Sequence, residues 1–212
     1  MNAATRKALP NAITMLRLVL AAAFFVILGT VVTRTMDEQR SVMGAVAVGL
    51  FILAAVTDAV DGWLARRWQV TSVFGRIMDP FCDKVLVLGA FVYLAGATLA
   101  EPMDRPELHP ATGVSAWMVV VILARELLVT SVRGVVEAEG HSFGADWFGK
   151  AKMILQSFTI PVCLAVATRA SMLDSSIWRG ARDALVWATV AVTAASVLPY
   201  LLRARRLLGR PS

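Results

Sequence analysis

The stretch Val42–Asp61 reads VMGAVAVGLFILAAVTDAVD, and its composition decides the class of fold. No charged residue occurs in it before Asp58. A helix of about 20 residues, rising ~1.5 Å per residue, crosses the ~30 Å hydrocarbon core of a bilayer. Comparable apolar runs follow one another through the chain: Ile13–Thr33, Pro80–Ala100, Gly113–Arg133, Met153–Ala170 and Ala184–Leu202. The sequence therefore predicts an all-α integral membrane bundle of six transmembrane helices.

The overall composition also indicates a membrane protein. The chain has 212 residues, of which 58% are hydrophobic and 17% are charged, whereas soluble domains carry about a quarter charged residues. Six spanning helices use most of the chain, so we expect residues 1–212 to form a single membrane domain. The first run is longer than the ~7–15 apolar residues of a signal peptide, and we expect it to be a retained span.

The basic residues indicate how the bundle is oriented. With both termini in the cytoplasm, most of the 21 lysines and arginines lie in inner segments, as the positive-inside rule requires. An anionic lipid leaflet then explains the formal net charge of +6, and no nucleic acid is needed. We therefore expect a multi-pass protein of the inner (cytoplasmic) membrane with both termini in the cytoplasm.

Four aspartates lie where the second run ends and the third begins. Asp58 and Asp61 are three positions apart and Asp79 and Asp83 are four apart, so each pair shares one face of its helix. A short cytoplasmic loop over Trp68–Gly75 makes the two helices antiparallel neighbours and brings the pairs together. Four carboxylates at one place repel one another unless cations compensate them, and hard divalent ions take oxygen ligands. We predict a divalent-metal site at the inner membrane boundary.

Simpler roles exist for the individual aspartates. Asp79 precedes a proline and could cap the N-terminus of the third helix, while Asp58 and Asp61 could pair locally with Arg66 or Arg67. As a group, however, ionisable residues inside a membrane are functional candidates. A guanidinium such as that of Arg66 beside carboxylate-bound metal suits a phosphate ligand. These residues indicate phosphoryl-transfer chemistry at the cytoplasmic membrane surface.

The aspartates belong to a longer pattern, Asp58-x-x-Asp61-Gly62-x-x-Ala65-Arg66, then eight residues, then Gly75-x-x-x-Asp79-x-x-x-Asp83. This pattern resembles the signature of the CDP-alcohol phosphatidyltransferases at every signature position. Three further segments are similar to the phosphatidylglycerophosphate synthase branch of that family: PNAITMLR at Pro10–Arg17, ARELLVTSVR at Ala124–Arg133 and GKAKMILQ at Gly149–Gln156. The resemblance covers most of the chain between Pro10 and Gln156, and the last apolar run carries no such signal.

The resemblance implies a six-helix membrane enzyme, usually a homodimer, that transfers a phosphatidyl group from CDP-diacylglycerol to an alcohol and releases CMP. It implies that Asp58, Asp61 and Asp79 bind two Mg²⁺ or Mn²⁺ ions. Asp83 would contact the second ion and act as general base on the acceptor hydroxyl. The residues at CDP-diacylglycerol-binding positions are Asn11, Thr14, Gly62, Arg66 and Ser72. Helix capping is the alternative role for Asn11.

Basic residues in the fourth and fifth runs indicate an anionic acceptor. Arg125 and Arg133 lie in the fourth run, and Lys150 and Lys152 enter the fifth from the same side. The acceptor that the resemblance names is sn-glycerol 3-phosphate, whose phosphate these four residues would bind. They could instead be ordinary flanking charges at the inner boundary. Met153 departs from the branch, where a threonine often follows the second lysine of the GKxK run.

The sequence alone leaves two alternative functions open. The same chemistry could use another acceptor alcohol, such as inositol phosphate, serine or phosphatidylglycerol. A divalent-cation transporter could use the aspartates as a permeation site, but it would need a polar path to the outer face. The outer parts of the second and third runs, Val42–Val56 and Leu88–Ala100, contain no charged residue, and this disfavours a transporter.

Overall fold

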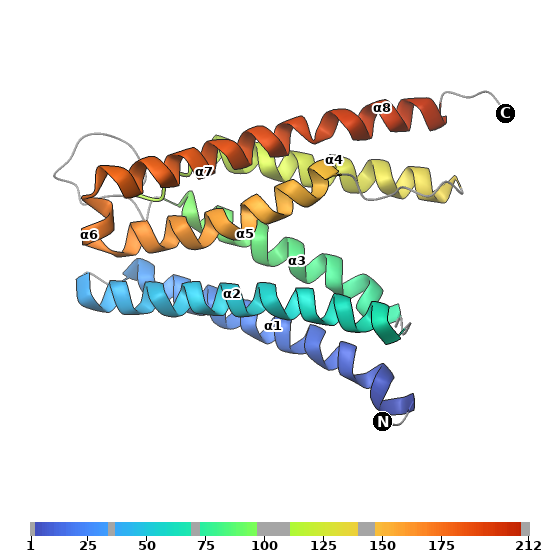
Figure 1. The fold of residues 1–212 in the computed structure, drawn as a ribbon, viewed down its shortest axis with the longest axis horizontal. Coiled ribbons are helices and arrows are strands. Elements are labelled where there is room, and N and C mark those ends of the chain that lie inside the picture. Colours follow the sequence, from blue (N-terminus) through green and yellow to red (C-terminus); the bar gives the residue numbers. More distant parts are fainter. Residues whose placement is uncertain (1–2, 34–36, 69–72, 97–110, 140–146, 209–212) are drawn as a thin grey trace.

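The computed structural model describes residues 3–33, 37–68, 73–96, 111–139 and 147–208. Within these ranges the regular elements are α-helices, without any strand: α1 (Ala3–Thr33), α2 (Asp37–Trp68), α3 (Val73–Leu94), α4 (Ala116–Ala138), α5 (Trp147–Thr168), α6 (Ala170–Leu173), α7 (Ser176–Ala195) and α8 (Val197–Leu208). The long helices lie side by side in an elongated bundle (Figure 1). The predicted all-α class is confirmed.

The helices reach further than the apolar runs at the end that carries the aspartates. α2 continues past Asp61 to Trp68, and α3 already begins at Val73. Pro80 therefore lies inside α3, where it withholds one backbone hydrogen bond. The expected loop over Trp68–Gly75 is wrong in its extent, because both of its ends are helical and only residues 69–72 separate α2 from α3.

Four helical segments within the described residues are long and apolar enough to cross a membrane: Ala12–Val31, Glu38–Val60, Trp147–Thr168 and Ser176–Leu202. The last of these continues from α7 into α8, which follow one another along nearly one line (Figure 1). α3 and α4 are 22 and 23 residues long, but each carries several charged side chains. The membrane character of the chain is supported, and a count of six spans remains a prediction.

Both ends of the chain lie at the same end of the bundle. The first turn of α1 and the last turn of α8 lie at the end where α2 finishes and α3 starts (Figure 1). The four predicted metal ligands therefore lie in the halves of α2 and α3 that are nearer to this end of the bundle. This arrangement agrees with the expected placement of both termini on one side of the membrane.

The centre of the bundle is filled by large apolar side chains. Phe24, Phe51 and Phe91 are at most 1% exposed, and the rings of Phe24 and Phe51 are 5.6 Å apart. Apolar side chains also cover the outside: Val26 and Leu198 are 66% and 65% exposed. Such a surface is unfavourable in water but suits contact with lipid, so the helices are held together mainly by close packing.

Close packing gives one prediction for the fold. A Cβ atom added at Gly44 of α2 would lie 2.5 Å from Cβ of Thr168 on α5, and overpacking of this kind costs about 1–3 kcal/mol. Gly44→Ala should therefore lower the thermal unfolding temperature in detergent. Gly49→Ala, on the same helix with nothing within 4 Å, is the matched control and should leave that temperature unchanged or slightly raised. Equal effects of the two substitutions would contradict this packing.

Candidate active site

Two of the predicted metal ligands meet at one buried arginine. Arg17 of α1 is 1% exposed, and its Nη1 lies 2.6 Å from Oδ1 of Asp58 on α2 and 3.9 Å from Oδ1 of Asp79 on α3. The hydroxyl of Thr14, one helical turn before Arg17, donates to Asp79 Oδ1 at 2.8 Å. Three helices thus bring their polar groups to one point. The Asp58 and Asp79 carboxylates are partly exposed there, at 36% and 43%.

The helix-capping roles considered for two of these residues do not hold. Asp79 cannot cap the N-terminus of α3, because that helix begins at Val73. Asn11 likewise lies within α1 and not at its start. Asp58 forms an ion pair with Arg17 from another helix, and its pairing with Arg66 or Arg67 stays an open alternative.

Several predicted site residues fall outside the described part of the structure. Ser72 lies between α2 and α3, where the chain is not described, and the side chains of Asn11, Asp61 and Arg66 are not described although their backbones are helical. Gly62 lies within α2. The predicted roles of these residues therefore remain predictions.

The aspartates were also expected to form one metal-binding cluster. Among the side chains that the structure describes, no three Asp, Glu, His or Cys residues lie close enough to hold a metal ion. Asp58 and Asp79 nevertheless present oxygens to the same guanidinium nitrogen of Arg17. Magnesium sites commonly combine one or two carboxylates with water and substrate phosphates. This donor pair fits part of such a site, and the Arg17 guanidinium supplies a compensating positive charge.

A second polar region opens beside Asp83. A hollow of about 500 Å³ lies between α3, α4, α5 and α8, which we call the basic hollow. This volume is typical of small-ligand sites. All four predicted acceptor-binding residues line it: Arg125, Arg133, Lys150 and Lys152. The other charged side chains in its lining are Asp83, Lys84, Glu126 and Glu137. Basic groups outnumber acidic ones, so the basic hollow suits an anion.

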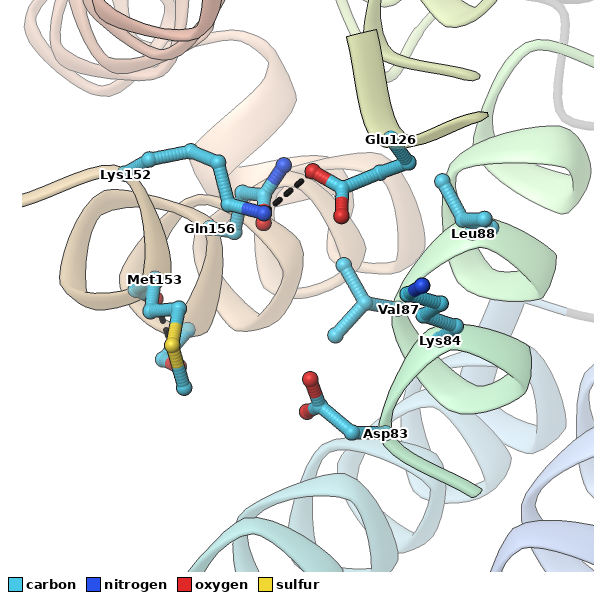
Figure 2. A pocket seen from close by; sticks show the side chains of 9 residues that line it. Asp83, Lys84, Val87, Leu88, Glu126, Lys152, Met153 and Gln156 are labelled. Atoms are coloured by element: carbon cyan, nitrogen blue, oxygen red, sulfur yellow. Dashed lines mark hydrogen bonds and ion pairs between the residues drawn. The ribbon is translucent and has the colours of Figure 1, made fainter. Parts of the chain in front are cut away.

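Glu126 links two of the basic residues across the basic hollow. Nζ of Lys152 on α5 donates to Oε1 of Glu126 on α4 (Figure 2). Nη1 of Arg125 donates to the same oxygen at 3.0 Å. Because Arg125 and Lys152 are only 6% and 7% exposed, the carboxylate between them reduces the repulsion of two buried cations. The three groups together keep one net positive charge.

Asp83 lies between the two polar regions. The charges of both regions act on its carboxylate: those of Asp58 and Arg17, and those of Lys152 and Glu126. Its side chain points into the space between α3 and α5 that the Lys152–Glu126 pair also faces (Figure 2). A proton acceptor at this position borders the basic hollow.

A smaller pocket of about 30 Å³ adjoins the basic hollow and shares Asp83, Glu126 and Lys152 with it. That volume is enough for about one water molecule or hydroxyl group. Gln156 lines this pocket, is 3% exposed, and has an amide nitrogen without a hydrogen-bond partner among the described residues. The pocket therefore offers a buried donor close to Asp83.

Comparison with known proteins decides the family. The family model for CDP-alcohol phosphatidyltransferases matches residues 7–195. The chain belongs to the CDP-alcohol phosphatidyltransferase family. Members of this family generally depend on divalent metal ions, and the match favours a transferase over a cation transporter.

Several curated relatives of this phosphatidyltransferase carry the name CDP-diacylglycerol–glycerol-3-phosphate 3-phosphatidyltransferase. The protein of this name from Bacillus subtilis is 34% identical over 162 residues, covering 74% of this chain and 76% of the relative. That from Cereibacter sphaeroides is 30% identical over 182 residues, covering 84% and 71%. The Sodalis glossinidius protein is 32% identical over 161 residues, covering 74% and 76%.

Some residues of the phosphatidyltransferase site were missed by reasoning from the sequence. Arg17 and Gln156 each end a segment that resembles the family, and the sequence assigns neither of them a role. For Arg17 a signal was available, since it lies three positions after Thr14 and so shares its helix face. No local pattern marks Ser196 and Tyr200, which both contact Arg125 from the end of the chain.

Proposed function

We propose that this phosphatidyltransferase transfers the phosphatidyl group of CDP-diacylglycerol to sn-glycerol 3-phosphate, giving phosphatidylglycerophosphate and CMP. The observation that carries the proposal is the lining of the basic hollow. Asp83, the last aspartate of the family signature, lies in it together with Arg125, Arg133, Lys150 and Lys152. One cavity thus holds a proton acceptor for the hydroxyl group of a phosphorylated alcohol and cations for its phosphate. The name shared by the relatives agrees with this acceptor.

The proposed reaction is a substitution at phosphorus. The acceptor's 1-hydroxyl oxygen forms a bond to the phosphorus that carries the diacylglycerol, and the bond from that phosphorus to the CMP oxygen breaks. The hydroxyl proton passes to Asp83, and CMP leaves with the electron pair. General-base assistance of this kind contributes about 10²–10⁴-fold to the rate. The acceptor phosphate, held by the basic side chains, keeps the hydroxyl directed toward Asp83.

We assign binding of the CDP-diacylglycerol diphosphate to the region around Arg17, Asp58 and Asp79, which we call the diphosphate region. Asp58, Asp61 and Asp79 would hold two Mg²⁺ or Mn²⁺ ions, with Asp83 in contact with the second. When bound, these ions screen the diphosphate and stabilise the attacking and leaving oxygens. Arg17 keeps Asp58 and Asp79 close together through its ion pairs. Thr14 orients Asp79 by its hydrogen bond.

The nucleotide lipid would also meet residues around this region. We assign its binding to five positions: Asn11, Thr14, Gly62, Arg66 and Ser72. Thr14 lies beside Asp79, which supports this assignment.

The lipid substrate also determines where the enzyme works. We propose six spans in the inner (cytoplasmic) membrane, with both termini and the site on the cytoplasmic side, and a homodimeric enzyme. A site at that boundary lets a leaflet-bound lipid meet a water-soluble acceptor. The first turn of α1 and the last turn of α8 lie at the end of the bundle where α2 finishes and α3 starts, and this supports the topology.

The acceptor can be tested with the purified full-length protein in detergent. With CDP-diacylglycerol and Mg²⁺, sn-glycerol 3-phosphate should release CMP and give phosphatidylglycerophosphate, and EDTA should abolish the release. Serine, inositol phosphate and phosphatidylglycerol, tested in parallel, should give at least tenfold less CMP release. Serine has no phosphate, phosphatidylglycerol carries a phosphodiester, and inositol phosphate places a bulkier ring on its phosphate monoester. CMP release with one of these three, and none with glycerol 3-phosphate, would assign the enzyme to another acceptor. Flux of Mg²⁺ into sealed vesicles without CDP-diacylglycerol would instead indicate a transporter.

A further inference from the structure

Arg125 is held by protein contacts on two of its three guanidinium nitrogens. Its Nε donates to Oγ of Ser196 at 2.8 Å, and its Nη1 donates to Glu126 at 3.0 Å. The remaining nitrogen, Nη2, is buried without a hydrogen-bond partner among the described residues. A buried donor without a partner is costly in a folded protein. Since Arg125 lines the basic hollow, Nη2 is the part of the guanidinium left for a bound anion.

Ser196 lies at the break between α7 and α8, and this position lets its hydroxyl contact Arg125. It forms the C-terminal cap of α7, and α8 begins at the next residue. Pro199, one turn later, explains the break, because a proline cannot bond the carbonyl four positions earlier and clashes with it. The Ser196 hydroxyl donates to the carbonyl of Thr193 at 2.7 Å. With its proton used there, the oxygen faces Arg125 as an acceptor.

Tyr200 fixes the plane of the same guanidinium. Its side chain is buried, and its ring centroid lies 5.4 Å from Cζ of Arg125, within the range of a cation–π interaction. The Tyr200 hydroxyl lies against Gly149 of α5, and a Cβ atom added at that glycine would be 3.2 Å from it. The absence of a side chain at Gly149 therefore leaves room for the tyrosine. Tyr200 itself lines the basic hollow.

We propose that Ser196 and Tyr200 are positioning residues that set Arg125 to bind the phosphate of the acceptor. The inference rests on the proposed function and extends it, because residues at the junction of α7 and α8 then contribute to acceptor specificity. Arg133 also lines the basic hollow. Its Nε, like Nη2 of Arg125, is buried without a hydrogen-bond partner among the described residues. Two buried N–H donors without a partner among the described residues suit the several oxygens of a phosphate monoester.

The test compares four variants of the full-length enzyme with the wild type. Ser196→Ala removes the hydrogen bond to Nε, and Tyr200→Leu removes the ring. Each should raise the KM for sn-glycerol 3-phosphate about tenfold, as expected for a lost contact to a charged group. The kcat and the KM for CDP-diacylglycerol should stay within about twofold, because Ser196 and Tyr200 act on Arg125, which lines the basic hollow.

Two variants serve as controls in the same assay. Tyr200→Phe keeps the ring and should restore a KM near the wild-type value. Leu198→Ala changes an outward-facing residue of α8, 65% exposed, and should leave all constants unchanged. A binding measurement runs alongside: inorganic phosphate should raise the unfolding temperature of the wild type and Leu198→Ala, and it should do so less in Ser196→Ala and Tyr200→Leu.

The outcomes separate this inference from the proposed function. If the wild type turns over glycerol 3-phosphate but the acceptor KM of Ser196→Ala and Tyr200→Leu is unchanged, the inference is wrong and the function stands. A parallel change of kcat and both KM values, in step with lost stability, overturns it as well. If glycerol 3-phosphate is not used, but the phosphate-induced stabilisation is lost in both variants, the function fails and the positioning role stands. Absence of both signals overturns both.

Discussion

Asp83→Asn is expected to reduce turnover by about 10²–10⁴-fold, the usual contribution of a general base. Asparagine has nearly the same shape as aspartate, but its amide cannot take the proton of the acceptor hydroxyl. The side chain at this position lines the basic hollow and is only partly buried, so folding should be little affected. CMP release by the purified variant, at saturating concentrations of both substrates, measures the loss.

The same preparation separates catalysis from folding and binding. Its unfolding temperature and its Mg²⁺-dependent affinity for a CDP-diacylglycerol analogue should stay close to the wild-type values, because the three other aspartates remain and the asparagine amide keeps an oxygen beside the second ion. Asp174→Asn makes the same chemical change at an exposed residue after α6, and its turnover should be unchanged. A folded Asp83→Asn enzyme with near-normal kcat would mean that another group accepts the proton.

The sequence predicts those parts of the site that depend on spacing along one helix. Asp58 and Asp61, or Asp79 and Asp83, share a face because of the helical period, and the apolar runs show where the helices lie. The family signature then indicates the chemistry. The exact helix ends could not be predicted, because the polar residues after Asp61 continue α2 without an apolar pattern.

Contacts between distant segments could not be predicted in this way. Arg125 and Ser196 are 71 positions apart, and their contact depends on how α7 and α8 pack against α4. The last apolar run carries no motif, yet Tyr200 lines the basic hollow. The Arg17 ion pairs likewise depend on the packing of α1 against α2 and α3, which no local pattern encodes.

Arg17→Met is expected to lower both stability and activity. Methionine fills a similar length but leaves Asp58 and Asp79 without the cation that lies 2.6 and 3.9 Å from their oxygens. The cost should be about 1–3 kcal/mol, below the ~3–5 kcal/mol of a fully buried pair, because solvent screens carboxylates that are 36% and 43% exposed. Repulsion should also displace these carboxylates, and a shift of about 1 Å lowers turnover on the order of 10²-fold.

A double substitution separates the loss of stability from the loss of turnover. Asp58→Asn added to Arg17→Met removes an unpaired charge, so part of the lost stability should return, while turnover stays low because Asp58 is a proposed metal ligand. Mg²⁺ should raise the unfolding temperature of Arg17→Met more than that of the wild type, since the ion then has no competing guanidinium at those oxygens. Arg205→Met, at an exposed position of α8, should stay within about 0.5 kcal/mol of the wild type. Additive stability losses in the double variant would show that Arg17 and Asp58 are not coupled, and the two carboxylates would then need another source of positive charge to lie so close together.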